Sequence, residues 1–320
     1  MNKKKKVVVI GGGNGSATII RSLKCNVDLF DISAIISMAD SGGSSGRLRE
    51  EFDTLPPGDI LRAILAMSAN YDYETILKPL FYKKRYQGIN KLNGHNLGNI
   101  FLVLASQYSG DFVSAVRALE QSVGAVGKVY PSTVNRVQLV AELDNGDEVF
   151  SEAEIDRPKY DRSIKIKKIK LSDKAIIYPE AFETIVKADY IIFSTGSLFC
   201  SVIATILPDG FADAFLKSNA KFIYIAGNKF ELDGETGPIC MSKNLNTLEE
   251  YLPRRIDKMI FNVHELNELQ KEYYKNKRWG LLDYDPENVK STVIVGENFE
   301  RKIGGLDANI LGNIFKRELV

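Results

Sequence analysis

The sequence is poor in the residues that build disulfide frameworks and zinc cages. Only three cysteines occur among the 320 residues, at Cys25, Cys200 and Cys240, and no two of them form a Cys-x-x-Cys pair. Widely separated cysteines without that spacing argue against both a structural zinc site and a disulfide scaffold. We therefore expect a protein of a reducing compartment, the cytoplasm.

Long apolar runs and an excess of charge of one sign are also missing. The apolar run at residues 7–10 is too short for a signal peptide, and no later stretch reaches the ~18 apolar residues of a membrane span. The formal net charge of +1 at pH 7 argues against a broad basic surface for nucleic acid. We expect neither a membrane span nor a nucleic-acid partner. A few arginines and lysines still suffice for a small phosphorylated ligand.

The chain does contain a regular alternation of short apolar runs and helical stretches. The apolar runs are bounded by turns and lack polar alternation, as in strands that are buried on both faces. Such strands are predicted at residues 7–10, 33–38, 190–193, 221–226, 258–262 and 291–295. Helices are predicted at residues 17–24, 179–187 and 306–317. This rhythm predicts an α/β fold with a Rossmann-like, doubly wound and mostly parallel sheet.

Two stretches interrupt the rhythm within what we expect to be a single domain over residues 1–320. A helical insertion is predicted at about residues 59–122, with helices at 59–69, 96–108 and 111–122. A small antiparallel β element is predicted at about residues 131–171. There, runs at 137–143 and 148–155 flank the hairpin signal Asn145-Gly146, and residues 164–170 alternate isoleucine with lysine.

The first candidate site is the glycine loop after the first predicted strand. It reads Gly11-Gly12-Gly13-Asn14-Gly15-Ser16. Glycines let a ligand approach the backbone, and the helix that follows offers unpaired amides and a partial positive charge to an anion. The loop matches neither a Walker A motif nor the dinucleotide fingerprint, because no Gly-Lys-Ser/Thr follows and Ser16 replaces the last glycine. A glycine turn that binds nothing is an equally good interpretation.

The second loop, Asp40-Ser41-Gly42-Gly43-Ser44-Ser45-Gly46-Arg47, follows the next predicted strand. Its amides and hydroxyls can donate to phosphate, and Arg47 can bind phosphate with two parallel hydrogen bonds. Asp40 could accept from a ribose hydroxyl or hold Mg²⁺. The alternative, a flexible linker with an isolated arginine, is less favoured because a buried strand precedes the loop.

Later loops add further candidates. Asp59 follows Pro56-Pro57-Gly58, and on chemistry alone a helix-capping role is favoured over a role in the site. His95, in Asn93-Gly94-His95-Asn96-Leu97-Gly98-Asn99, could donate to phosphate, act as an acid or base, or only support a helix start. Ser194-Thr195-Gly196-Ser197 and Gly227-Asn228-Lys229 end two later strands and could present donors to an anion. No convincing Ser-His-Asp set accompanies them.

In this order the five motifs resemble the gluconeogenesis factor family (YvcK-like), which is related to 2-phospho-L-lactate transferase (CofD-like). The similarity extends from about Val7 to Phe230. It implies a Rossmann-like fold and a site for a uridine-diphosphate sugar, with UDP-N-acetylglucosamine as the family ligand. It also implies a regulatory role in cell-wall synthesis and cell shape during growth on gluconeogenic carbon sources, through a cell-wall synthesis partner.

The predicted ligand-binding residues combine the motif positions with the strand-end loops. They are Gly12, Gly13, Asn14, Gly15, Asp40, Gly42, Gly43, Ser44, Ser45, Arg47, Asp59, His95, Asn96, Asn99, Gly196, Ser197 and Asn228. No catalytic residue and no required cofactor are predicted. Asp40 and Asp59 would be the ligands if Mg²⁺ binds.

The chain departs from the family pattern in places. Asn14 and Ser41 stand where the family usually has threonine and aspartate, and Gly305-Leu306-Asp307 replaces an Arg-His-Asp element. The loss of a carboxylate beside Asp40 weakens the case for transferase chemistry more than the case for binding.

Two enzymatic interpretations stay open beside the regulatory one. In the first, a transferase moves a phosphoryl-linked group from a nucleotide donor with Mg²⁺, and Arg47 stabilises charge on phosphate. In the second, a nicotinamide-dependent dehydrogenase uses Asp40 to hold the ribose, although the imperfect glycine pattern counts against it. A homodimer is compatible with the sequence, which contains no signal for an oligomeric state.

Overall fold

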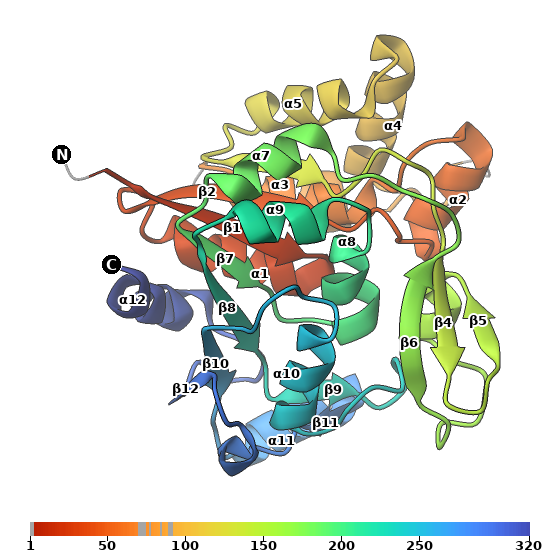
Figure 1. Ribbon diagram of the computed structural model, residues 1–320. Coiled ribbons are helices and arrows are strands. Elements are labelled where there is room, and N and C mark those ends of the chain that lie inside the picture. Colours follow the sequence, from red (N-terminus) through yellow and green to blue (C-terminus); the bar gives the residue numbers. More distant parts are fainter. Residues whose placement is uncertain (1–2, 70–74, 77, 84, 89–91) are drawn as a thin grey trace.

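The main sheet has seven parallel strands, in the order β12-β10-β8-β7-β1-β2-β3 (Figure 1). The computed structural model describes residues 3–69, 75–76, 78–83, 85–88 and 92–320. The strands are β1 (Lys5–Gly11), β2 (Phe30–Ile36), β3 (Lys128–Pro131), β7 (Tyr190–Phe193), β8 (Lys221–Ala226), β10 (Lys258–Asn262) and β12 (Val293–Glu297). The chain starts in the middle of the sheet and builds outward on both sides of β1, which confirms the doubly wound α/β prediction.

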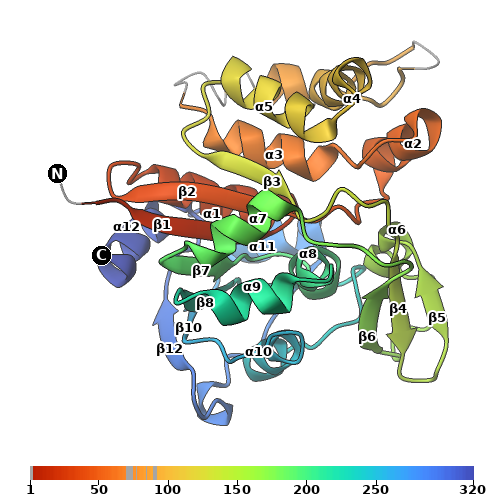
Figure 2. The same cartoon turned by 45° about the horizontal axis from the view of Figure 1, so that its top comes forward.

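The first strand shows why its apolar run is continuous. Val7 and Val9 pack into one hydrophobic core, whereas Val8 and Ile10 pack into another. Successive side chains of a strand point to opposite faces, so both faces of this sheet are covered. Helices α1 (Gly13–Lys24), α3 (Gly58–Met67) and α12 (Ala308–Leu319) contribute to the first core, and α7 (Pro179–Val186), α9 (Phe211–Lys217) and α10 (Met241–Glu249) to the second (Figure 2).

A helical layer follows the second glycine loop. It contains α2 (Gly43–Phe52), α3, the π-helix η2 (Pro79–Lys83), α4 (Leu97–Ser109) and α5 (Phe112–Ser122). The predicted helices at 96–108 and 111–122 are present, and their caps explain their starts. Asn96 accepts from the amide of Asn99, and Asp111 accepts from the amides of Val113 and Ser114. Residues 70–74, 77, 84 and 89–91 of the predicted insertion lie outside the described residues.

The antiparallel element is present, with the strand order β5-β4-β6. Its strands are β4 (Leu139–Leu143), β5 (Glu148–Phe150) and β6 (Ile166–Leu171). The predicted strand at 148–155 was wrong beyond Phe150, because helix α6 (Glu152–Asp156) begins there. Ser151 caps α6 by accepting from the amide of Glu154 at 3.4 Å, which the alternating pattern did not reveal.

A two-stranded ribbon lies beside the carboxyl end of β8. It pairs β9 (Lys229–Glu231) with β11 (Trp279–Leu281) in antiparallel fashion, and α11 (Glu268–Lys277) precedes β11. The ring of Trp279, the only tryptophan of the chain, lies 3.7 Å from the Lys229 Nζ and 5.3 Å from the ring centre of Tyr274. The remaining short elements are η3 (Leu198–Ile203), α8 (Ala204–Ile206) and η4 (Pro286–Asn288).

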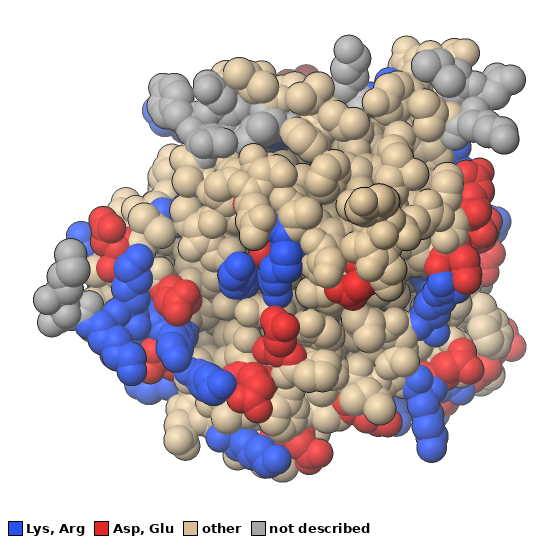
Figure 3. Space-filling model, turned by 90° about the horizontal axis from the view of Figure 1, so that it is seen from above, with Lys and Arg blue, Asp and Glu red and all other residues tan. Residues whose placement is uncertain are grey.

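The surface charge and the helix lengths can be compared with the expectation of neither a nucleic-acid partner nor a membrane span. Viewed from above, basic and acidic side chains are interspersed, and both kinds also lie near the middle of the visible face (Figure 3). Across the described ranges, no helix combines the length and apolar character that crossing a bilayer requires.

Candidate functional site

The first glycine loop joins β1 to α1 and packs tightly on the loop after β7. A Cβ at Gly15 would lie 1.6 Å from the carbonyl oxygen of Thr195, so only glycine allows this contact. Helix α1 starts at Gly13 with no side-chain cap. The amide of Gly13 itself donates to Asp59, so an anion could be bound only by the amides that follow it in the first turn.

Asp59 is joined to this loop rather than to the start of its own helix. Its Oδ2 accepts from the amide of Gly13 at 2.8 Å, and its Oδ1 pairs with Arg62 at 2.7 Å. Helix α3 has no side-chain cap at all. The capping role that chemistry alone favoured is therefore wrong, because the carboxylate finds a partner 46 residues earlier in the chain.

The second glycine loop joins β2 to α2 and folds around Asp40. Asp40 Oδ1 accepts from the amide of Gly42 at 2.9 Å, and Ser45 Oγ accepts from the amide of Gly58 at 3.2 Å. Burial raises the pKa of Asp40, and the nearby carboxylate of Asp59 raises it further. The two predicted metal ligands therefore lie close together, and each already accepts a backbone amide.

His95, Ser44 and Asn99 form one hydrogen-bonded network at the start of α2. Ser44 Oγ lies 2.8 Å from His95 Nδ1 and accepts from Asn99 Nδ2 at 3.0 Å. His95 is 2% exposed, and burial together with the positive charges of Arg47 and Arg85 lowers its pKa. The imidazole is therefore neutral near pH 7 and is suited to donate or accept a hydrogen bond.

Arg47 is exposed and holds the loop that contains His95. One guanidinium nitrogen donates to the carbonyl of Asn93 at 2.9 Å. A Cβ at Gly94 would lie 2.8 Å from the same group. Arg47 thus connects α2 to the 93–95 loop, and its exposure leaves donors available to a ligand.

The loop after β7 donates to a carboxylate of the chain itself. Glu235 accepts from the Ser197 hydroxyl and from the amides of Phe199 and Cys200, at 3.2 and 3.1 Å for the two amides. The donors that the sequence offered to an anion are therefore used by Glu235. The sequence reasoning missed this residue, because an acidic residue in a loop has no local signature.

Glycines at three strand ends leave room for a Cβ atom at ordinary van der Waals distance. A Cβ placed on Gly13, Gly196 or Gly227 would find no atom closer than 3.8 Å outside its chain neighbours. The side chain of Ser201 is the common neighbour of Gly13 and Gly196, which shows that these two loops adjoin. These glycines follow β1, β7 and β8, which are adjacent in the sheet. The three glycines therefore lie at neighbouring strand ends around the switch point of the sheet, where doubly wound proteins bind ligands.

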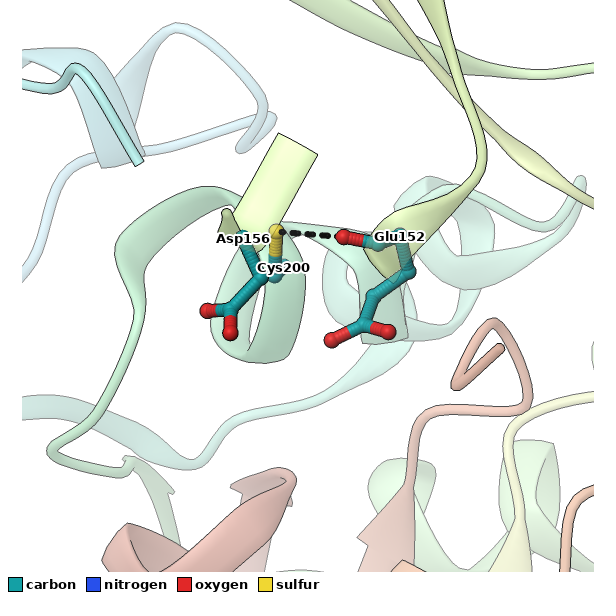
Figure 4. Close-up of side chains that lie close together, drawn as sticks. All are labelled: Glu152, Asp156 and Cys200. Carbon is teal, nitrogen blue, oxygen red and sulfur yellow. Dashed lines mark hydrogen bonds between the residues drawn. The ribbon is translucent and has the colours of Figure 1, made fainter. Parts of the chain in front are cut away.

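A second set of missed residues lies beside Asp40. Glu152, Asp156 and Cys200 place one ligand atom each within 4.8 Å of one another, and the two carboxyl groups point to the same side (Figure 4). The Cys200 thiol donates to the backbone carbonyl of Glu152 at 3.9 Å, and the Glu152 carboxylate accepts from the amide of Ser41 at 3.2 Å.

The acidity of these carboxyl groups is strongly altered. Burial, followed by the charge of Asp40, raises the pKa of Glu152 to about 8. Burial, followed by the charge of Glu235, raises the pKa of Asp156 to about 6. The two carboxyl groups could together hold a hard divalent cation, whereas burial raises the pKa of the Cys200 thiol and makes it a poor ligand for one.

Seventeen residues were predicted to bind ligand, and the structure gathers most of them at one edge of the sheet. The two glycine loops, Asp59, and the His95 loop are linked by the contacts described above, and Gly196 adjoins Gly13. Asn96 caps α4, and Asn14 is exposed at the start of α1. Asn228 lies farther along the edge, at the end of β8, where the Tyr274 hydroxyl donates to its Oδ1 at 3.0 Å.

The fold and this strand-end geometry define an α/β protein with a candidate site at the switch point of its sheet. The chain belongs to the CofD family: the model of 2-phospho-L-lactate transferase CofD matches residues 7–297. The gluconeogenesis factor of Bacillus subtilis is 34% identical over 293 residues, 91% of this chain and 89% of that protein. The gluconeogenesis factor of Halalkalibacterium halodurans is 34% identical over 291 residues, 90% of this chain and 87% of that protein.

The solved structures agree with this relationship. A member of the UPF0052 family from Bacillus halodurans superimposes with a TM-score of 0.89 at 29% identity, over 99% of this chain and 100% of that one. The resemblance deduced from the five sequence motifs and the fold that it implied are thereby confirmed.

Proposed function

We propose that this chain is a cytoplasmic regulatory protein that binds a uridine-diphosphate sugar, UDP-N-acetylglucosamine, over the ends of β1, β2, β7 and β8. The starts of α1 and α2, which follow the neighbouring strands β1 and β2, carry this proposal. Helices α1 and α2 both begin with glycine caps that make no side-chain hydrogen bond. Their amides suit the two phosphates of such a ligand.

Cationic groups beside these amides support the same ligand class. Arg62 lies 3.9 Å from the Cβ position of Gly13, and Arg47 is exposed at the second loop. Guanidinium groups next to helix starts favour phosphate over neutral ligands.

The regulatory role follows from the relatives, several of which are named gluconeogenesis factors. By extension, the liganded chain would act on a partner in cell-wall synthesis and so influence cell shape. Homodimerisation is part of the same proposal and is checked by sedimentation.

Titration calorimetry with UDP-N-acetylglucosamine, with and without Mg²⁺, tests the proposal. Saturable, metal-independent binding without turnover is the expected result. The variant Gly227→Val adds a side chain at the end of β8, where the nearest atom to its Cβ is 3.9 Å away, so it should fold normally and bind weakly. Absence of heat with the unmodified chain, and no competition by UDP, would contradict the proposal.

A second candidate is a transferase that moves a phosphoryl-linked group from a nucleotide donor with Mg²⁺. The observation that favours it is the set of carboxylates formed by Asp40, Glu152 and Asp156 beside the glycine loops. Mg²⁺ held there would neutralise charge on the phosphates of the donor. Incubation with nucleotide-linked donors and Mg²⁺, followed by mass spectrometry of the small molecules, distinguishes turnover from binding.

A further inference from the structure

Helix α4 is apolar on two opposite sides, although its own chain covers only one of them. The buried side consists of Gly98, Asn99, Leu102 and Val103. Leu61 of α3 leaves no room for a Cβ on Gly98, so this side packs closely on α3. A helix at the surface normally has polar residues on the side opposite its buried face. In α4 that opposite side is apolar as well.

The second apolar side, called here the α4 stripe, consists of Leu97, Phe101, Leu104 and Tyr108. These positions are separated by four, three and four residues, which is the spacing of the seam between two packed helices. Leu97 and Phe101 are half-buried, whereas Leu104 is 53% exposed and Tyr108 is 96% exposed. A contiguous apolar stripe of this kind indicates a contact that the described residues of one copy do not make.

The surface around the α4 stripe is almost free of charge. Helix α4 contains no charged residue. Helix α5, which packs beside it, contains only Arg117 and Glu120, and these two pair with each other at 2.8 Å. Figures 1 and 2 show both helices on the outside of the molecule, and Figure 3, which looks onto that side, shows a wide uncharged area. A strongly acidic or basic partner would find no complementary charge on these helices.

We propose that the α4 stripe is the contact surface of a homodimer, in which the α4 helices of two copies pack against each other about a two-fold axis. Such an interface is formed by the same patch on both copies, so residues near the axis meet residues of the same patch. Charged residues would repel one another there, whereas an uncharged apolar seam is complementary to itself. The inference specifies the homodimer that is part of the proposed function, but it requires no nucleotide.

The same helix also takes part in the candidate site. The side chain of Asn99, in the first turn of α4, donates to Ser44 Oγ at 3.0 Å. Leu104 and Tyr108 lie in the later turns. The dimer contact and the network around His95 therefore share one rigid element, with the network at its start and the most exposed part of the stripe at its end.

Sedimentation equilibrium of the purified full chain without ligand tests the inference. The average mass should rise with concentration and level off at two chains, because a two-fold contact is closed. A mass that stays at one chain up to the solubility limit would overturn the inference, and so would a mass that keeps rising beyond two chains. A dimer that fails to bind UDP-N-acetylglucosamine would contradict the proposed ligand and leave this inference intact.

Two variants of the stripe supply the complementary test. Leu104→Glu and Tyr108→Glu should each raise the Kd of the dimer by about a hundredfold or more, because both copies lose an apolar contact and like charges approach each other. Tyr108 is so exposed that its replacement should leave the fold intact, which circular dichroism checks. Leu216→Glu, at an exposed leucine of α9, is the matched control and should leave the Kd unchanged. An unchanged Kd in both stripe variants, or an equal loss in the control, would overturn the inference.

A lipid surface would give a different result. A monomeric chain that binds vesicles of phosphatidylglycerol and phosphatidylethanolamine, and loses this binding in Tyr108→Glu, would assign the stripe to a membrane and overturn the homodimer. The expected result is a dimer whose sedimentation is the same with and without such vesicles.

Discussion

The carboxylate of Asp59 accepts a hydrogen bond from the amide of Gly13 at 2.8 Å and thereby fastens the start of α3 to the first glycine loop. The same carboxylate pairs with Arg62 at 2.7 Å. One side chain thus sets the position of both the first glycine loop and the cation beside it.

Asp59→Asn should destabilise the protein by about 1–3 kcal/mol, because a largely buried ionic hydrogen bond to Arg62 is lost. Denaturant unfolding measures this change. Asp31→Asn, an exposed position on β2, serves as the control and should alter stability by less than about 0.5 kcal/mol. A similar, small effect for both variants would show that Asp59 does not anchor the loop.

Arg47→Ala should weaken binding of UDP-N-acetylglucosamine by about tenfold while the melting temperature changes little. The reason is that Arg47 is exposed and makes one hydrogen bond to the 93–95 loop, so most of its donors are available to phosphate. Calorimetry and thermal unfolding separate the two effects. A large loss of melting temperature with unchanged affinity would instead assign a structural role to the arginine.

Glu235→Gln should raise the affinity for UDP by about three- to tenfold, since a neutral amide competes less well than a carboxylate for the donors of Ser197, Phe199 and Cys200. Glu231→Gln, on β9 of the same segment, is the matched control and should leave the affinity unchanged. An unaltered affinity in Glu235→Gln, with a lower melting temperature, would mean that Glu235 only caps the helical segment.

Stability should fall as the pH rises from about 4 to about 8. Burial raises the pKa of Glu152 to about 8 and that of Asp156 to about 6, so the folded chain keeps protons that the unfolded chain releases. The free energy of unfolding therefore decreases over this range. The decrease ends once the pH exceeds the higher of the two folded-state pKa values, that of Glu152. Denaturant unfolding at several pH values measures the slope.

Glu152→Gln should remove most of this slope, whereas Glu154→Gln, at an exposed position of the same helix, should preserve it. Mg²⁺ should restore stability to the unmodified chain near pH 8, where both carboxyl groups are ionised. A slope that is the same in all three proteins would show that Glu152 does not carry the effect.

The strands that could be predicted from the sequence are those buried on both faces. Residues 7–10 and 221–226 form continuous apolar runs because helices cover both sides of the sheet. Strand β3 and the β9–β11 ribbon escaped prediction, because they are three or four residues long and contain charged or small residues. Their pairing is decided by neighbours distant in the chain and not by their own pattern.

The residues of the candidate site also form two groups, those that could be recognised from the sequence and those that could not. Gly13, Ser44 and His95 lie in loops whose composition is unusual, so they could be recognised locally. Glu152 and Glu235 could not, because each is an ordinary acidic residue that becomes part of the site only when the chain folds. Asp59 was recognised but given the wrong partner, since helix capping is the commoner role of an aspartate at that position.

The only tryptophan of the chain lies on the β9–β11 ribbon, which begins directly after Asn228. Its ring contacts Lys229 and Tyr274, and the hydroxyl of Tyr274 donates to the amide of Asn228. Any shift of the ribbon changes the surroundings of this indole. The protein therefore carries its own spectroscopic reporter, and the intrinsic fluorescence of Trp279 would record changes around this ribbon without a label.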